Sequence, residues 1–333
     1  MVASPVIWSL RLWIGRLAGA ILLVGATPAG AAEPYTPSYE QMLSAATAMK
    51  AASEAVLYRK LERGIWPGSQ YDPNWTGLIG QEYTPSTTTA ATLANKRTAT
   101  NPDFAAALAR LLAAQGIGED STVLLVESGS FLGADIAALT ALEALDANVI
   151  LILSLGSSQW GANDPELNLL EIMSLLRERG IVRSVPLAVV IGGAGAVGGN
   201  MEPEGVERLR PSFARHSDIP LVEVRPTSAV VARLREMIDE AAGGEDSIDL
   251  MIKTGGSVIS VGACRENYQM PTGLIPRPRE CSGTPGLFYL VGGDHLRVLN
   301  ILAMKQIAEE LGLPYDPVPL PMPGLNPAVY GEP

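Results

Sequence analysis

The sequence predicts an α/β protein, a three-layer sandwich built on a mostly parallel, Rossmann-like sheet. Five short apolar runs lack polar alternation, which is typical of strands buried on both faces. Helical segments separate most of these runs, so we expect right-handed crossovers between parallel strands. The five runs are Val123–Val126, Val149–Leu153, Leu187–Ile191, Leu250–Ile252 and Phe288–Val291.

A loop of Gly, Ser and Thr follows each run. Loops that follow parallel strands gather at one edge of the sheet, and ligands bind in the crevice there. These loops are too small and too polar to be core. The sequence therefore predicts a binding site at the carboxyl ends of the strands.

The helices are predicted from caps and periodicity. The capping box Ser38-Tyr39-Glu40-Gln41 opens a helix that ends at Gly64, and Asn101-Pro102-Asp103 opens one that reaches Gln115. Between them, residues 65–100 form a long polar loop, and loops of this length are often functional. Further helices are expected at Leu132–Leu145, Pro165–Arg179, Pro203–Arg215, Ser228–Ala242 and Leu296–Leu311, and a short strand at Pro220–Val224.

Residues 1–32 are predicted to be a signal peptide or an N-terminal membrane anchor. Arg11 and Arg16 precede the apolar stretch Leu17–Ala26, and small residues follow. An anchor over Val6–Val24 would carry both arginines into the membrane, which favours a cleaved signal. We expect an exported, periplasmic protein in which residues 33–333 form a single α/β domain that ends in a proline-rich tail, 314–333.

Charge and cysteine content restrict the partners. The formal net charge of −11 repels nucleic acid, so we expect no nucleic-acid partner. Cys264 and Cys281 are the only cysteines, and in an exported protein such a pair predicts a disulfide. With only two histidines in the chain, the usual zinc ligand sets are hard to assemble, so no metal is expected.

A glycine motif at Gly193-x-Gly195-x-x-Gly198 formally matches the dinucleotide fingerprint. Its third glycine should lie inside a helix, yet Gly199-Asn200 continues the loop. The chain also has no Gly-Lys-Ser/Thr phosphate loop. We therefore expect no cofactor.

Three blocks carry a resemblance to a known family. Residues 80–104 read GQEYTPSTTTAATLANKRTATNPDF, residues 154–163 read SLGSSQWGAN, and residues 201–205 read MEPEG. They resemble the poly-γ-glutamate system protein family, an extracytoplasmic accessory family that accompanies poly-γ-glutamate synthesis. The resemblance covers roughly residues 36–330 and implies a pathway and a location. It assigns no catalytic residues.

Two serines are candidate nucleophiles. Ser128 and Ser130 lie between a buried strand and a helix, where a serine can act as a nucleophile or an anionic oxygen can bind. The alternative is that both simply cap the helix. A base could come from His295, beside Asp294, or from a desolvated Lys96; the alternatives are a helix-capping Asp294 and a solvated Lys96.

Other loop residues could bind a polyglutamate chain. Their hydroxyl, amide and backbone groups suit carboxylates and amide bonds, and Trp160 could stack on methylenes or fill the core. Thr87–Thr89 also raise the weaker idea of a threonine nucleophile. The candidate binding residues are Glu82, Thr87, Thr88, Thr89, Thr98, Ser157, Ser158, Gln159, Asn163, Gly193, Gly256 and Asp294.

Three functions remain open at this point. The first is an accessory protein that binds poly-γ-glutamate and assists its export or maturation. The second is a hydrolase or transferase that acts on γ-glutamyl amide bonds with a serine nucleophile. The third is a structural partner of the membrane-bound synthase. A hydroxyl within about 2.6–3.2 Å of a base would distinguish the enzyme from the other two.

Overall fold

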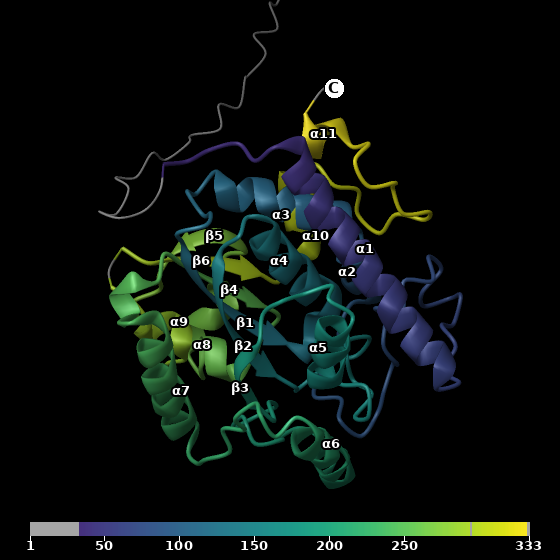
Figure 1. The fold of residues 1–333 in the computed structure, drawn as a ribbon. Coiled ribbons are helices and arrows are strands. Elements are labelled where there is room, and N and C mark those ends of the chain that lie inside the picture. The colour runs from purple at the N-terminus through teal and green to yellow at the C-terminus, as the bar shows by residue number, and fades with distance from the viewer. Residues whose placement is uncertain (1–32, 294, 332–333) are drawn as a thin grey trace, which may run out of the picture. The chain divides into compact units, whose positions relative to one another are not determined.

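A six-stranded, mostly parallel sheet forms the centre of the computed structural model, which describes residues 33–293 and 295–331. The strand order is β3-β2-β1-β4-β6-β5, and only β5 is antiparallel to its neighbour. The predicted α/β fold is confirmed (Figure 1). The strands are β1 (Thr122–Ser128), β2 (Asn148–Ser154), β3 (Pro186–Val190), β4 (Leu250–Thr254), β5 (Gly273–Pro276) and β6 (Arg297–Ile301).

Helices cover both faces of the sheet (Figure 1). They are α1 (Tyr39–Glu62), α2 (Leu93–Thr98), α3 (Asp103–Ala113), α4 (Leu132–Ala144), α5 (Leu169–Glu178), α6 (Pro203–Arg215), α7 (Thr227–Ala242), α8 (Val258–Val261), α9 (Leu287–Leu290), α10 (Met304–Leu311) and α11 (Pro327–Tyr330).

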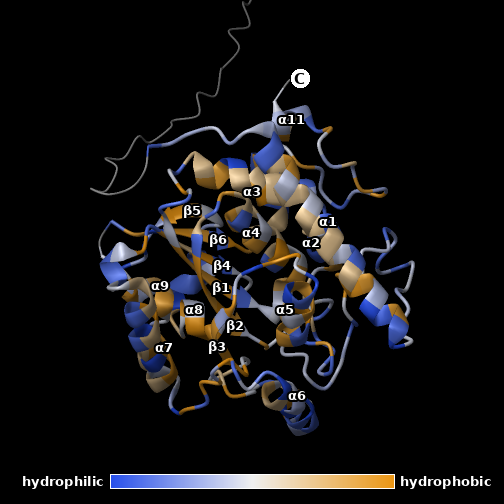
Figure 2. Ribbon diagram, in the orientation of Figure 1, coloured by the Kyte–Doolittle hydropathy of each residue, from blue (hydrophilic) through white to orange (hydrophobic). Residues whose placement is uncertain are grey.

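Alternate residues of each strand pack into two separate cores. On β1, Val123 and Leu125 join the core under α1, α3, α4 and α5, whereas Leu124 and Val126 join the core under α7, α8 and α9. Both sets are buried because a strand with helices on both faces has no solvent side. Figure 2 shows the strands mainly in the orange of hydrophobic residues, and α6 largely in blue.

The predicted helix starts are confirmed in part. Ser38 and Gln41 form the expected capping box at α1. The predicted start of α5 at Pro165 is wrong, because Asn168 caps the helix by accepting from the Leu170 and Glu171 amides. The predicted strand at Pro220–Val224 is wrong as well, since only one isolated bridge, from Leu221 to Val189, forms there.

The elements predicted near the C-terminus are in the wrong order. Phe288–Val291 is not a strand, because Leu287–Leu290 forms the short helix α9. The predicted helix at Leu296–Leu311 begins instead as strand β6 and becomes helical only at Met304. A short apolar run does not distinguish a strand from a buried helical turn. As a result, the loop with Gly292 and Gly293 precedes β6 instead of following a strand.

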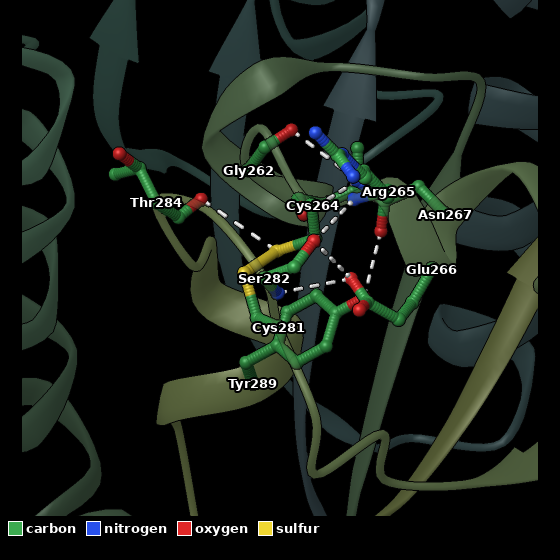
Figure 3. Close-up of a disulfide and its surroundings, with 10 residues drawn as sticks. Gly262, Cys264, Arg265, Glu266, Asn267, Cys281, Ser282, Thr284 and Tyr289 are labelled. Carbon is green, nitrogen blue, oxygen red and sulfur yellow. Dashed lines mark hydrogen bonds between the residues drawn. A yellow bond between two sulfur atoms is a disulfide. The ribbon is translucent and has the colours of Figure 1, made fainter.

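A disulfide joins Cys264 and Cys281, with their Cα atoms 5.0 Å apart (Figure 3). It closes the excursion between α8 and α9, which carries strand β5, and it joins the cysteine pair that the sequence predicts. Glu266 ties the same two segments together, because its carboxylate accepts from the amide and hydroxyl of Ser282, at 3.1 and 3.2 Å. The excursion is therefore held by a covalent bond and by polar contacts.

Purified, non-reduced protein is expected to titrate no free thiol. The cysteines are 17 positions apart, and a cross-link across such a loop stabilises a protein by about 3 kcal/mol. The double variant Cys264→Ser/Cys281→Ser should lower the free energy of unfolding by that amount in urea titrations. Two titratable thiols in the native protein would contradict the disulfide.

Within residues 33–293 and 295–331, no helix has the length and apolar character needed to cross a membrane. The predicted signal or anchor, residues 1–32, lies outside the described residues.

Candidate functional site

A cavity of about 540 Å³ lies at the carboxyl ends of β1, β2 and β4. This is the edge of the sheet where the sequence predicts a binding site. Its walls come from α2, from the loops after β1, β2, β3 and β4, and from the segment just before α2. The polar lining residues are Thr88, Thr89, Thr92, Asn95, Lys96, Ser128, Ser130, Ser154, Ser158, Asn200 and Ser257.

Lys96 lies in this wall and is almost fully buried, with 7% of its surface exposed. Its Nζ is 2.8 Å from the Ser158 hydroxyl and donates to the Ser130 carbonyl. The Phe131 ring covers the ammonium group at 4.8 Å. Arg97, the next residue, turns away to pair with Asp316. The alternative of a solvated lysine beside an arginine is therefore wrong.

Burial makes Lys96 an unusually weak base for a lysine. Desolvation lowers the pKa of Lys96 to about 7, and the negative charge of Asp135 partly opposes this effect. A large fraction of the side chain is then neutral at physiological pH. A neutral amine next to a serine hydroxyl can accept its proton.

Three serines next to Lys96 are linked by hydrogen bonds. The Ser158 amide donates to the Ser130 hydroxyl oxygen at 3.0 Å, and the Ser130 amide donates to the Ser128 hydroxyl oxygen at 3.3 Å. Ser128 in turn donates to the Gly156 carbonyl at 3.4 Å. Ser128 and Ser130 line the cavity but contact Lys96 only through the Ser130 carbonyl. The hydroxyl within reach of the base thus belongs to Ser158, which the sequence suggested only as a binding residue.

Two buried acids lie behind the site. Burial raises the pKa of Asp135 to about 7, while hydrogen bonds from Thr254 and the Ser128 amide and the charge of Lys96 oppose this rise. Burial also raises the pKa of Glu127 well above its usual range, and the charge of Asp135 adds to the effect. Neither carboxyl oxygen of Glu127 has a hydrogen-bond partner among the described residues. Burial and the charge of Asp135 thus both favour the protonated form of Glu127.

The sequence blocks that carry the family resemblance lie side by side. Asn163 bridges them, because its side chain accepts from the Gln81 amide and donates to the Thr87 hydroxyl. The Ser157 carbonyl accepts from the amide of Thr88 at 2.7 Å. These contacts hold residues 80–91 against the loop after β2, and so bring Lys96 and Ser158 together.

Several predicted binding residues have structural roles instead. Thr87, Ser157 and Asn163 use their side chains to join loops, and Thr98 bonds the Ala94 carbonyl within α2. The Gln159 side chain accepts from the Ala91 amide. None of these five is among the residues that line the cavity. Of the remaining predicted binding residues, Thr88, Thr89, Ser158, Gly193 and Gly256 line it, and Glu82 lies at a second cavity.

His295 does not meet the serines. It lies just before β6, at the amino ends of the parallel strands, near the segment that precedes β4. A five-residue strand spans about 13 Å, and this length separates His295 from the cavity edge. The predicted role of His295 as the base is therefore wrong. Asp294, its predicted partner, lies outside the described residues.

The side chains that could ligate a metal ion are clustered at the disulfide, away from the cavity. In the described part of the chain, the metal-ligating types that cluster are Cys264, Glu266 and Cys281. Both sulfurs are in the disulfide and cannot act as thiolate ligands.

The chain was compared with protein-family models, with curated proteins and with solved structures. It matches none of them. The resemblance to the poly-γ-glutamate family thus stays an expectation, and the chemistry has to be argued from the site.

Sequence reasoning missed part of the site. It overlooked Asp135, Asn95 and Asn200, and the 2.8 Å hydrogen bond between Ser154, at the end of β2, and Ser257, just before α8. One signal was present for Asp135. It is the only acid in the first two turns of the otherwise apolar segment that forms α4, and a lone acid in such a helix indicates a buried polar contact.

Proposed function

We propose that the protein is a serine–lysine hydrolase or acyltransferase that acts on amide bonds of a glutamyl-containing substrate. The observation that carries this proposal is the 2.8 Å contact between Lys96 Nζ and the Ser158 hydroxyl inside a cavity. The geometry meets the distance criterion for a nucleophile and its base. The glutamyl substrate class comes from the family resemblance.

The reaction follows from the contacts of Lys96. Neutral Lys96 keeps one N–H on the Ser130 carbonyl, which leaves its lone pair for the Ser158 proton. The Ser158 oxygen attacks the substrate carbonyl and forms an ester, and the ammonium of Lys96 returns the proton to the leaving amine. Water or an amine acceptor, deprotonated by the same lysine, then releases the acyl group and regenerates the hydroxyl.

Ser130 has a supporting role in this reaction. Its hydroxyl oxygen accepts from the Ser158 amide, and its own proton has no acceptor among the described residues. This proton can be donated to the negative charge that develops on the substrate carbonyl oxygen. Ser130 thus assists the transition state, while Ser158 is the nucleophile.

The charge of the cavity favours an enzyme over a polymer-binding accessory. Lys96 is the only cation among its described lining residues, and it must be neutral to act as a base. A chain with a carboxylate on every residue would need several cations to bind tightly. The cavity suits one glutamyl unit, whose single carboxylate can accept from threonine and asparagine side chains.

The proposal also places the protein outside the cytoplasm, near the membrane-bound synthase that makes the polymer. The disulfide supports this location, because such bonds persist in oxidising compartments. An exported enzyme would meet the polymer as it emerges.

A serine-reactive probe tests the nucleophile. A fluorophosphonate should add to the Ser158 oxygen with loss of fluoride, and mass spectrometry of peptides should find the adduct on Ser158 alone. In parallel, gel filtration should show poly-γ-glutamate shortened by the wild-type protein and unchanged by Ser158→Ala. Ser128→Ala is the matched control and should keep both activities. An adduct on Ser128 or Ser130, or no adduct at all, would reject the assignment.

A further inference from the structure

A second cavity, of about 510 Å³, lies on the other side of the loop that carries Ser158. Ser158 lines the first cavity, whereas Trp160 and Gly161 line the second. The volume is within the range of about 300–1,000 Å³ that small-molecule sites occupy. The proposed reaction uses none of its residues.

Aromatic side chains form much of the wall. Tyr71 and Trp160 are packed with their ring centroids 4.6 Å apart. Trp66 stands at the cavity with 68% of its surface exposed, although its ring also meets Trp75 edge to face at 6.5 Å. Exposing a tryptophan beside a cavity leaves a large apolar face without a partner. Such faces are suited to stacking on a ligand.

Hydrogen-bond donors and acceptors complete the wall of the second cavity. Lys60 is buried, and its Nζ donates to the Ile79 carbonyl at 2.8 Å, which leaves two further N–H donors. Asp72 is saturated by Thr76 and Gly77, but Glu82 has no hydrogen-bond partner among the described residues. Both donors and acceptors therefore face the cavity.

The charges select the class of ligand. Among the described lining residues, three carboxylates, on Asp72, Glu82 and Asp164, stand against one ammonium, that of Lys60. This excess of negative charge repels a polyglutamate chain. An organic cation would be attracted by these carboxylates, but the buried ammonium of Lys60 in the same wall offsets part of that attraction. A neutral ligand with hydroxyl groups can use the donors and the acceptors together.

We propose that this second cavity is a binding site for a neutral oligosaccharide. The C–H face of a sugar ring stacks on the exposed Trp66 indole, and its hydroxyls bond the Lys60 ammonium and the Glu82 carboxylate. The lining of the second cavity alone defines this site, which therefore does not depend on Ser158 being a nucleophile. A glycan held here would lie two residues from the proposed catalytic serine.

Isothermal titration of the full chain with chitotetraose, cellotetraose and maltotetraose tests the site. At least one of them should bind, with an affinity that barely changes between low and high salt because the ligand is neutral. Trp66→Ala should weaken that binding by about tenfold or more. Tyr268→Ala is the matched control, since Tyr268 is 93% exposed and is not among the lining residues; it should leave the affinity unchanged.

Three results would overturn this inference. The first is no binding of any of the three sugars at about 10 mM, a concentration that detects even millimolar affinity. The second is sugar binding that Trp66→Ala leaves intact. The third is salt-sensitive binding of tetramethylammonium in place of the sugars, which would make the cavity a cation site.

Discussion

Lys96→Met is expected to slow the acylation of Ser158 by at least about 10³-fold at pH 8. Methionine keeps the length and the apolar contacts of the buried stem but cannot accept the serine proton. Because the side chain is buried under Phe131, the loss of its charge should leave the fold intact. The rate of fluorophosphonate labelling measures the effect, and circular dichroism checks that the variant is folded.

The pH dependence of labelling should identify the same group. Burial lowers the pKa of Lys96 to about 7, and only the neutral amine can act as a base. The rate should therefore rise about tenfold per pH unit below 7 and become level above it. In Lys96→Met this acid limb should be absent.

A second buried lysine provides the control for this profile. Burial also lowers the pKa of Lys253 to about 7, yet Lys253 bonds the Gly255 carbonyl and is not among the residues that line the cavity. Lys253→Met should keep the acid limb, whatever its effect on the absolute rate. If the acid limb survived in Lys96→Met and disappeared in Lys253→Met, the base would be Lys253 and the assignment to Lys96 would be wrong.

The fold class could be predicted because it depends on local pattern. Apolar runs without alternation, separated by capped helices, are enough to indicate a parallel sheet with helices on both faces. The exchange of strand and helix after Gly286 could not be predicted in the same way. Leu287–Leu290 and Arg297–Ile301 are both short, and the difference is decided by which segment pairs with β4. Tertiary contacts, and not the local sequence, therefore decide which of the two segments becomes a strand.

The exchange also explains why His295 was misplaced. A loop after a parallel strand lies at the cavity edge, whereas a loop before one lies at the opposite edge. Once Arg297–Ile301 is the strand, the residues in front of it move to the far end of the sheet. The error in element type had thus placed His295 at the cavity edge, and the observed strand β6 puts it at the opposite edge.

The pairing of Lys96 with Ser158 had no signal in the sequence. The two residues are 62 positions apart, and Lys96 lies in a segment without periodicity. Their meeting depends on irregular contacts such as the Thr88 amide with the Ser157 carbonyl and the Ala91 amide with the Gln159 side chain. Such contacts follow no repeat, so spacing cannot reveal them. Spacing indicated the edge of the sheet where the cavity lies, but not that Lys96 reaches the hydroxyl of Ser158.

Gly80→Ala should damage both stability and activity through these same irregular contacts. A Cβ atom at Gly80 would lie 1.8 Å from the Gly161 carbonyl oxygen and 2.5 Å from the Asn163 side chain. Residues 80–88 would then have to move away from the loop after β2. The Gly80 amide would lose its bond to the Trp160 carbonyl, and the Trp160 amide would lose its bond to the Gln81 carbonyl.

We expect Gly80→Ala to lower the free energy of unfolding by about 3 kcal/mol, since backbone atoms cannot give way as a flexible side chain can. It should also slow the labelling of Ser158 by about 10²-fold, because a shift of about 1 Å in a reacting group has this effect. Gly256→Ala is the control for stability: its Cβ would meet no atom within 4 Å, so the free energy should change by less than about 0.5 kcal/mol. If Ser158 were labelled at the wild-type rate in Gly80→Ala, the contacts between the two loops would not be responsible for aligning Lys96 with Ser158.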